Sequence, residues 1–128
     1  MPITFSINLK AGYFLSKYRG VITDALLLSS YQDFHEGDNW VPGLHELADL
    51  SQADMTRVTE TGLRKLSEYV ESVYREHGQS YIKTAAFAPT DLPFGIARMY
   101  EVFSSKSPEY LQVFRLIDDA ESWLVIDA

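Results

Sequence analysis

The sequence predicts a mixed, mostly parallel α/β sheet with the element order ββαβαβαβα. Two observations support this fold class. Short runs with strand-like patterning alternate with stretches in which apolar residues recur at helical spacing, and the links between them are short. The run at residues 81–88 is apolar on both faces, which is typical of an interior strand in a parallel sheet. The parallel strands are expected to be joined by right-handed crossovers.

The first two strands are predicted at residues 3–9 and 13–18. A turn containing Gly12 separates them and makes them a hairpin, so one strand of the sheet is antiparallel. Thr23 is placed to cap the helix that follows, and Gly37 is placed to end it.

The third strand is predicted at residues 44–50, with His45 and Asp49 on one face. Thr56 is expected to cap the longest helix, and Gly78 occupies the position of a left-handed C-terminal cap. The predicted buried stripe of this helix consists of Leu63, Leu66, Val70 and Val73.

After the interior strand, the next helix begins at Thr90 or Asp91. Its predicted core stripe is Ile96, Met99, Tyr100 and Phe103. The last strand is predicted at residues 110–116, and Asp118 and Glu121 resemble the capping pair of a terminal helix. That helix is expected to bury Trp123 and Leu124.

Size and charge limit the classes of function. The 128 residues suffice for one domain with a substantial core, and we expect a single domain over residues 1–128. The net charge of −7 has the wrong sign for a nucleic-acid binder, which must displace counterions from phosphates. No apolar stretch is long enough to span a bilayer, so no transmembrane segment is expected.

Other features argue against several kinds of site. The chain has no cysteine, which excludes a disulfide framework, a thiolate zinc site and a cysteine nucleophile. The N-terminus lacks the basic and apolar regions of a secretory signal peptide, and a cytoplasmic protein is expected. No glycine-rich phosphate loop occurs, and no cofactor is expected.

Several polar residues are candidates for a metal site or for helix capping. Strand alternation places His45 and Asp49 on one face but Glu46 on the other. Two ligands are too few for zinc, so we expect these three residues to be ordinary hydrogen-bonded polar groups. His35 and His77 fall in the last turns of two helices, where a partial positive charge is favourable, and capping is their expected role.

Three more residues are candidates for a contact surface. Arg98 lies one turn after Phe94, where its guanidinium can pair with Glu101, bond strand-end carbonyls or, as the alternative, hold an anionic ligand. Gly95 in a helix interior predicts close backbone packing against a neighbour or a ligand. Trp40 lies in a polar loop; we expect it to be buried beneath that loop, with exposure as a contact residue as the alternative.

Several short segments occur in an order and at a spacing shared with a known family. They are Tyr18-x-Gly20-x-x-Thr23, the strand end at Asp49, Pro89-x-Asp91-x-x-Phe94-Gly95-x-x-Arg98-Met99, Val113-Phe114 and Ala120-x-x-Trp123-Leu124. Together they resemble the STAS-like superfamily, and most closely its bacterial branch similar to sporulation stage II protein AA, also called STAS/SEC14-like. The resemblance covers roughly residues 5–126.

The resemblance implies a four-turn βα superhelix and a function in binding. Regulatory STAS domains bind protein partners and are switched by phosphorylation of a serine in an Asp-Ser-Ser/Thr-Gly motif at the start of the second helix. The corresponding stretch here is Asp54-Met55-Thr56-Arg57, so Met55 replaces the acceptor serine and the usual switch is not expected. SEC14-type relatives bind lipids in an apolar pocket, but they carry additional helices that are not predicted here.

Three classes of function remain open. We favour a non-enzymatic interaction or regulatory module that binds a protein partner. A binder of a small apolar or amphipathic ligand is the alternative, and an enzyme is least favoured because no Gly-x-Ser-x-Gly elbow surrounds Ser51. A homodimer is compatible with each class. The candidate residues of the partner or ligand surface are Asp54, Thr56, Asp91, Phe94, Arg98 and Trp40.

Overall fold

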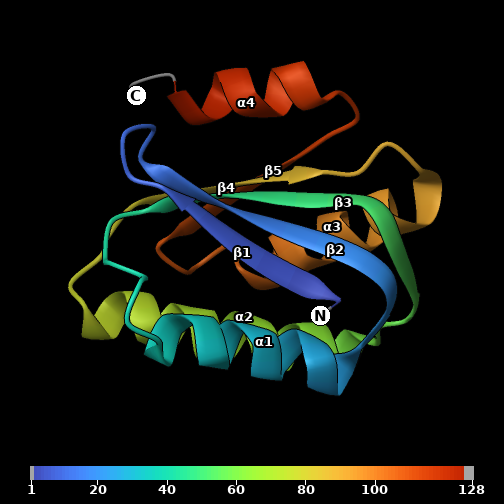
Figure 1. Ribbon diagram of the computed structural model, residues 1–128. Helices are drawn as coiled ribbons and strands as arrows, with labels where there is room; N and C mark the ends of the chain where they lie inside the picture. The colour runs from blue at the N-terminus through green and yellow to red at the C-terminus, as the bar shows by residue number, and fades with distance from the viewer. Residues whose placement is uncertain (1, 126–128) are drawn as a thin grey trace.

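The computed structural model of the protein describes residues 2–125 and contains a five-stranded sheet in the order β1-β2-β3-β4-β5 (Figure 1). Its strands are β1 (Ile3–Asn8), β2 (Tyr13–Thr23), β3 (His45–Arg57), β4 (Ile82–Phe87) and β5 (Glu109–Phe114). Its helices are α1 (Asp24–Glu36), α2 (Glu60–Glu76), α3 (Asp91–Phe103) and α4 (Ile117–Val125). β1 is antiparallel to β2 and every other pair is parallel, so the predicted element order and mixed sheet are confirmed.

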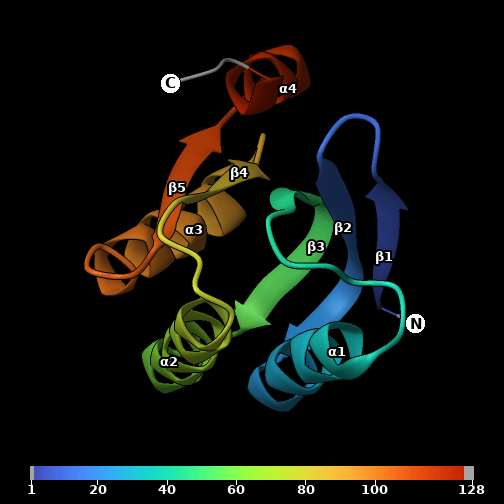
Figure 2. The ribbon, with the colours of Figure 1, turned by 90° about the vertical axis from the view of Figure 1, so that its left-hand side faces the viewer.

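The helices are divided unequally between the two faces of the sheet. Figure 2 shows α1, α2 and α3 on one side and α4 on the other. Alternate residues of each strand point to opposite faces, so Ala48 belongs to the main core under α1–α3, whereas Leu47 lies with Leu124 in a smaller cluster under α4.

Strands β2 and β3 are longer than the sequence pattern predicts. They pair in parallel as far as Thr23 and Arg57, well beyond the last pairing of β3 with β4 at Asp49. Residues 51–57 are mostly polar and lack an apolar run, but pairing with β2 satisfies backbone groups along the edge that faces β2. The prediction that Thr56 caps the second helix is therefore wrong, because Thr56 lies within β3 and α2 begins at Glu60.

The cap of α2 is instead Thr59, whose hydroxyl oxygen accepts a hydrogen bond of 3.1 Å from Gly62 N. Asp24, the first residue of α1, links the two helix starts, because its carboxylate accepts hydrogen bonds from the backbone N–H and the hydroxyl of Thr59. Gly62 leaves the space that this contact needs, since a Cβ atom there would lie 2.1 Å from Asp24 Cγ. Thr23 caps α1 as predicted, accepting from Leu26 N at 3.2 Å.

Several other predictions are confirmed. β4 lies between β3 and β5 and is almost entirely buried, as expected for residues 81–88. The whole predicted stripe of α2 is buried. Gly78 has a φ angle of +71°, the left-handed conformation predicted for it, and Gly37 is the C-terminal cap residue of α1.

Helix α3 buries fewer of the predicted residues than expected. Its fully buried positions are Pro93, Ala97 and Tyr100. Met99, predicted to be part of the core stripe, is exposed instead. Outside the backbone of α3 itself, no atom of residues 2–125 lies within 4 Å of the position of a Cβ at Gly95, so the close backbone packing expected there is not seen. Both differences have the same cause: the side of α3 that carries Gly95 and Met99 faces solvent and not the sheet.

Helix α4 begins at Ile117, so Asp118 lies inside the first turn and is not the cap residue predicted from its pairing with Glu121. Leu124 is buried as predicted, whereas Trp123 is only half-buried. The Trp123 ring packs at 5.7 Å from the Phe114 ring, between centroids. Within residues 2–125, no helix combines the length and apolar character needed to cross a bilayer.

Candidate functional site

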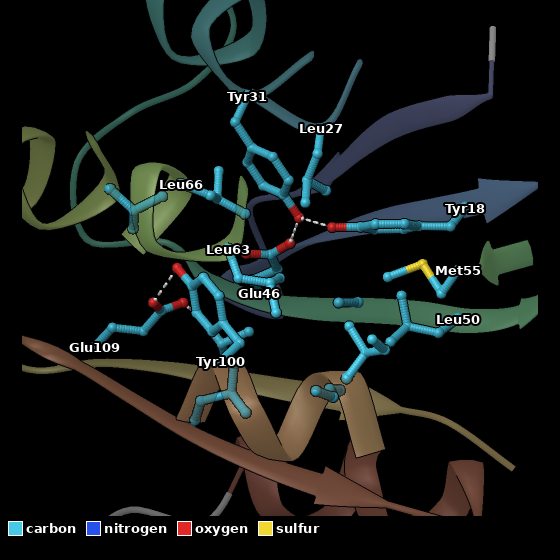
Figure 3. A pocket seen from close by; sticks show the side chains of 17 residues that line it. Tyr18, Leu27, Tyr31, Glu46, Leu50, Met55, Leu63, Leu66, Tyr100 and Glu109 are labelled. Carbon is cyan, nitrogen blue, oxygen red and sulfur yellow. Dashed lines mark hydrogen bonds between the residues drawn. The ribbon is translucent and has the colours of Figure 1, made fainter. Parts of the chain in front are cut away.

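A cavity of about 60 Å³ lies between the sheet and helices α1–α3 (Figure 3). Most of its lining is apolar and comes from both layers, including Leu27, Ala48, Leu50, Leu63, Leu66 and Ala97. Its polar lining residues are Tyr18, Tyr31, Glu46, Thr84, Tyr100 and Glu109. No Lys, Arg or His is among the described residues that line it. A space of this size holds about four water molecules.

Strand β3 places Glu46 in this cavity, on the same face as Ala48 and Leu50. The Glu46 side chain is buried, and its Oε2 atom accepts hydrogen bonds of 2.5 Å from both Ser16 Oγ and the Tyr31 hydroxyl. The Tyr18 hydroxyl lies 2.6 Å from that of Tyr31. Because the one proton of Tyr31 is directed to Glu46, Tyr18 donates to Tyr31, and the chain of hydroxyls ends at the carboxyl group.

The second carboxyl group belongs to Glu109, the first residue of β5. It is buried and accepts hydrogen bonds from Thr84 Oγ1 at 2.5 Å and from the Tyr100 hydroxyl at 2.9 Å. Thr84 pairs in register with Glu46 on one side and with Leu111 on the other, two residues beyond Glu109. Strand alternation therefore directs both glutamates and Thr84 to the same face of the sheet.

Burial changes the acid–base behaviour of both carboxyl groups. Removal from water and, to a smaller extent, the negative charge of Glu109 raise the pKa of Glu46 to about 7, against the opposing effect of the hydrogen bonds from Ser16 and Tyr31. Burial likewise raises the pKa of Glu109. Burial also raises the pKa of Tyr18, Tyr31 and Tyr100 well above the usual value, so these hydroxyls remain hydrogen-bond donors at neutral pH.

No protein-family model and no curated protein sequence matches the chain. Its structure is similar to the crystal structure of an uncharacterised protein of the DUF3478 family, with a SpoIIAA-like fold, from Shewanella loihica PV-4. The TM-score is 0.56 at 17% sequence identity, over 95% of this chain and 91% of the other. The chain has the SpoIIAA-like fold. The resemblance to the STAS-like superfamily is thus confirmed at the level of fold, which by itself assigns no activity.

In this SpoIIAA-like fold, the acidic residues predicted to form a partner surface lie outside the cavity. Asp54 is exposed and accepts hydrogen bonds from the backbone N–H and hydroxyl of Thr56, at 3.0 and 2.6 Å. Asp91 is also exposed and pairs with Arg115 at 2.8 Å. The Arg115 guanidinium lies 4.1 Å above the centre of the Phe94 ring. Asp91 and Phe94 therefore share a partner in Arg115, whereas Asp54 and Thr56 bond to each other.

The extension of β3 also changes the correspondence with the STAS phosphorylation motif. Residues 54–57 lie in the strand and not at the start of the second helix, so the correspondence predicted for that stretch is wrong. Met55 is buried and lines the cavity. From Asp49, where pairing with β4 ends, β3 continues for five residues to Asp54, a distance of about 16 Å along the strand.

Arg98 and Trp40 have structural contacts of their own. Arg98 is exposed and pairs with Glu101 at 3.4 Å, which confirms the first of its predicted roles. Trp40 is buried, with its ring 4.9 Å from that of His35 and 5.2 Å from that of His77, between centroids. The expected burial of Trp40 is confirmed, and the alternative of an exposed contact residue is wrong.

The three histidines have different roles. His35 does not cap α1 as predicted, because its Nδ1 atom lies 3.3 Å from the Tyr69 hydroxyl and its Nε2 atom has no hydrogen-bond partner among the described residues. Burial also lowers the pKa of His35 to about 4. His77 does cap α2, since its Nδ1 atom donates to the Val73 carbonyl oxygen at 2.8 Å. His45 Nδ1 accepts from Lys83 N at 2.9 Å, so this residue is the ordinary hydrogen-bonded group that we predicted. Within residues 2–125, no group of His, Asp and Glu side chains is arranged to hold a metal ion.

Sequence reasoning missed the two glutamates of the cavity. The prediction that Glu46 is an ordinary polar group overlooks strand alternation, which places it on the same face as Leu44, Ala48 and Leu50. A carboxyl group on the apolar face of a predicted strand was the available signal. Glu109 lies just before the strand predicted at residues 110–116, and its sequence neighbours carry no comparable signal.

Proposed function

We propose that the protein binds a small amphipathic molecule in the cavity between the sheet and helices α1–α3. The observation that supports this best is the combination of an apolar lining with two buried carboxyl groups in one space. Isolated carboxyl groups are costly to bury, and an apolar core avoids them. Apolar pockets with a few convergent polar groups are typical of small-molecule sites.

The arrangement of the lining favours an elongated, two-ended ligand. In Figure 3, the hydroxyl of Tyr31 and the carboxyl groups of Glu46 and Glu109 gather toward one end, and Leu50 and Met55 lie toward the other. The cavity volume of about 60 Å³ limits the size of the ligand. A cavity of about 150 Å³ holds benzene, so this one accepts a molecule of roughly two to four non-hydrogen atoms before the helices must move apart.

The test is a titration with small probes followed by two-dimensional amide NMR. Propylammonium, 1-propanol and propionate have the same short chain and different head groups. We expect at least one of them to shift signals of cavity residues on β3, β4 and α3. Ala97→Leu places a larger side chain in the cavity wall and should weaken that binding about tenfold or more.

Ala25→Leu is the matched control, because Ala25 is an exposed helical residue of α1 outside the cavity. It should leave probe binding unchanged. The proposal fails if none of the three probes shifts cavity signals, or if Ala97→Leu binds them as tightly as the wild type.

A protein-interaction module of the STAS-like type is the second candidate. Besides the fold, it is supported by the exposed apolar residues Leu92, Met99 and Val102, which recur along one side of α3. Exposed apolar patches mark interaction sites. In capture from native lysate, Met99→Lys with Val102→Lys should remove a partner that docks on α3, and Asp54→Lys should remove one that docks at the end of β3. If the variants still captured the partner, neither α3 nor the end of β3 would be its docking surface.

A further inference from the structure

We propose that the preferred occupant of the cavity is a primary ammonium ion with a short apolar substituent, that is, a small protonated alkylamine. This inference rests on the proposed function and specifies the chemistry of its ligand.

The first argument is the charge of the lining. It holds two acidic side chains, Glu46 and Glu109, and no basic one among the described residues. Neither glutamate takes part in any of the ion pairs found within residues 2–125. A carboxylate ligand would add a like charge in an apolar space, whereas an ammonium ion supplies the missing opposite charge.

The second argument is the direction of the hydrogen bonds. The hydroxyl protons of Ser16 and Tyr31 are directed to Glu46 Oε2, and those of Thr84 and Tyr100 are directed to Glu109. These hydroxyls therefore have no proton left to offer a ligand.

The described lining of the cavity offers a ligand a hydrogen-bond acceptor and no donor. The other oxygen of Glu46, Oε1, has no hydrogen-bond partner among residues 2–125, although only 4% of this residue is exposed. In Figure 3, the Glu46 side chain lies among the pocket-lining residues, between Tyr31 and Tyr100. An ammonium group offers three donors and no acceptor, which matches this need, whereas an alcohol offers one donor.

The third argument is the proton that the ligand would replace. Burial and mutual repulsion favour retention of a proton by the carboxyl pair when no cation is present. An ammonium ion that binds to the ionised form therefore displaces this proton. Binding should release up to about one proton near neutral pH, and affinity should rise as pH increases through about 7.

The experiment compares propylammonium, 1-propanol and propionate at constant ionic strength, using calorimetry and amide NMR. We expect propylammonium to bind about tenfold or more tightly than 1-propanol, and propionate to bind weakest. Glu46→Gln should bring the affinity for propylammonium down to that for 1-propanol. Glu68→Gln, an exposed position of α2, is the matched control and should change neither affinity.

The outcomes separate this inference from the proposed function. If 1-propanol or propionate binds as tightly as propylammonium, the cavity is a ligand site but the ammonium inference is wrong. If none of the probes binds, the cavity holds ordered water only and both proposals are wrong.

Proton release gives a second test that needs no variant. Calorimetry of the wild-type protein in two buffers of different ionisation enthalpy should detect release with propylammonium and none with 1-propanol. Binding of propylammonium without proton release at pH 7 would also overturn the inference, even if Glu46→Gln proved unable to fold.

Discussion

The hydroxyl group of Tyr31, on helix α1, donates a hydrogen bond of 2.5 Å to the buried carboxyl group of Glu46, on strand β3. The bond joins the first helix to the middle strand of the sheet at the wall of the cavity. Hydrogen bonds to charged groups contribute about 1.5–3 kcal/mol each to stability, more than bonds between neutral groups, so this bond contributes most when Glu46 is ionised. The polar end of the cavity is therefore part of what holds α1 in place.

Above pH 7, where Glu46 is ionised, Tyr31→Phe should lower the free energy of unfolding by about 1.5–3 kcal/mol, because Ser16 is then the one remaining donor to Glu46 Oε2 among residues 2–125. It should also raise the pKa of Glu46, since the bond from Tyr31 is one of the interactions that lower it. Urea unfolding and carbon-13 NMR of the carboxyl group measure the two effects. Tyr18→Phe removes a hydroxyl whose one hydrogen-bond partner among residues 2–125 is Tyr31, and it should cost about 1 kcal/mol. Equal losses in the two variants would contradict this account.

Glu46 should make the protein less stable as pH rises from about 4.5 to 7. The folded-state pKa of Glu46 is raised to about 7 from 4.5, so the folded state binds more protons than the unfolded state across this window. Stability then falls with increasing pH, by up to about 1.4 kcal/mol per pH unit, and levels off above the folded-state pKa. Glu46→Gln should remove this slope in urea unfolding measured at successive pH values.

His35 acts in the opposite direction over part of the same range. Its folded-state pKa is lowered to about 4 from 6.5, so the unfolded state binds more protons between these values and stability rises with pH. The prediction for Glu46 therefore concerns the difference in free energy of unfolding between the wild type and Glu46→Gln at each pH. The contribution of His35 is the same in both proteins and cancels in this difference. Parallel pH profiles for the two proteins would show that Glu46 is not perturbed by burial.

Gly62→Ala should have opposite effects in two backgrounds. In the wild type, the added methyl group would meet the Asp24 carboxylate and displace it from Thr59, so we expect a loss of about 1–2 kcal/mol. In an Asp24→Gly background the carboxylate is gone, and so is the Cβ atom of residue 24, which would lie 2.7 Å from the added methyl group. The helix preference of alanine should then stabilise the protein by up to about 1 kcal/mol. Urea unfolding of the four proteins gives the coupling directly. If Gly62→Ala changed the free energy of unfolding in the same direction in both backgrounds, Asp24 would not be the reason that glycine is needed at residue 62.

Trp123→Ala should cost less than the substitution of a fully buried tryptophan. The ring is half-buried against Phe114, so we expect about 1.5–2.5 kcal/mol instead of the usual 3–5. Leu124→Ala, at a fully buried neighbouring position, should cost about 2–5 kcal/mol. Thermal or urea unfolding compares the two. A larger loss for Trp123→Ala than for Leu124→Ala would place the main contact of α4 at the tryptophan.

Features that depend on residues close together in the chain were predictable from the sequence. The buried stripe of α2, the cap at Thr23, the left-handed Gly78 and the interior strand β4 are all as predicted. Each depends on helical or strand periodicity, or on one residue type at the end of a helix, and these signals extend over a single turn or strand. Their order along the chain sufficed to predict the fold class.

The tertiary structure alone decided where β3 ends and which groups meet in the cavity. Residues 51–57 form a strand because β2 continues beside them, and this pairing is invisible in their own polar sequence. Glu46 and Glu109, far apart in the chain, face one space because of the register of β3, β4 and β5. Register is set by the packing of the whole sheet against α1–α3, so no local pattern encodes the meeting of these two carboxyl groups.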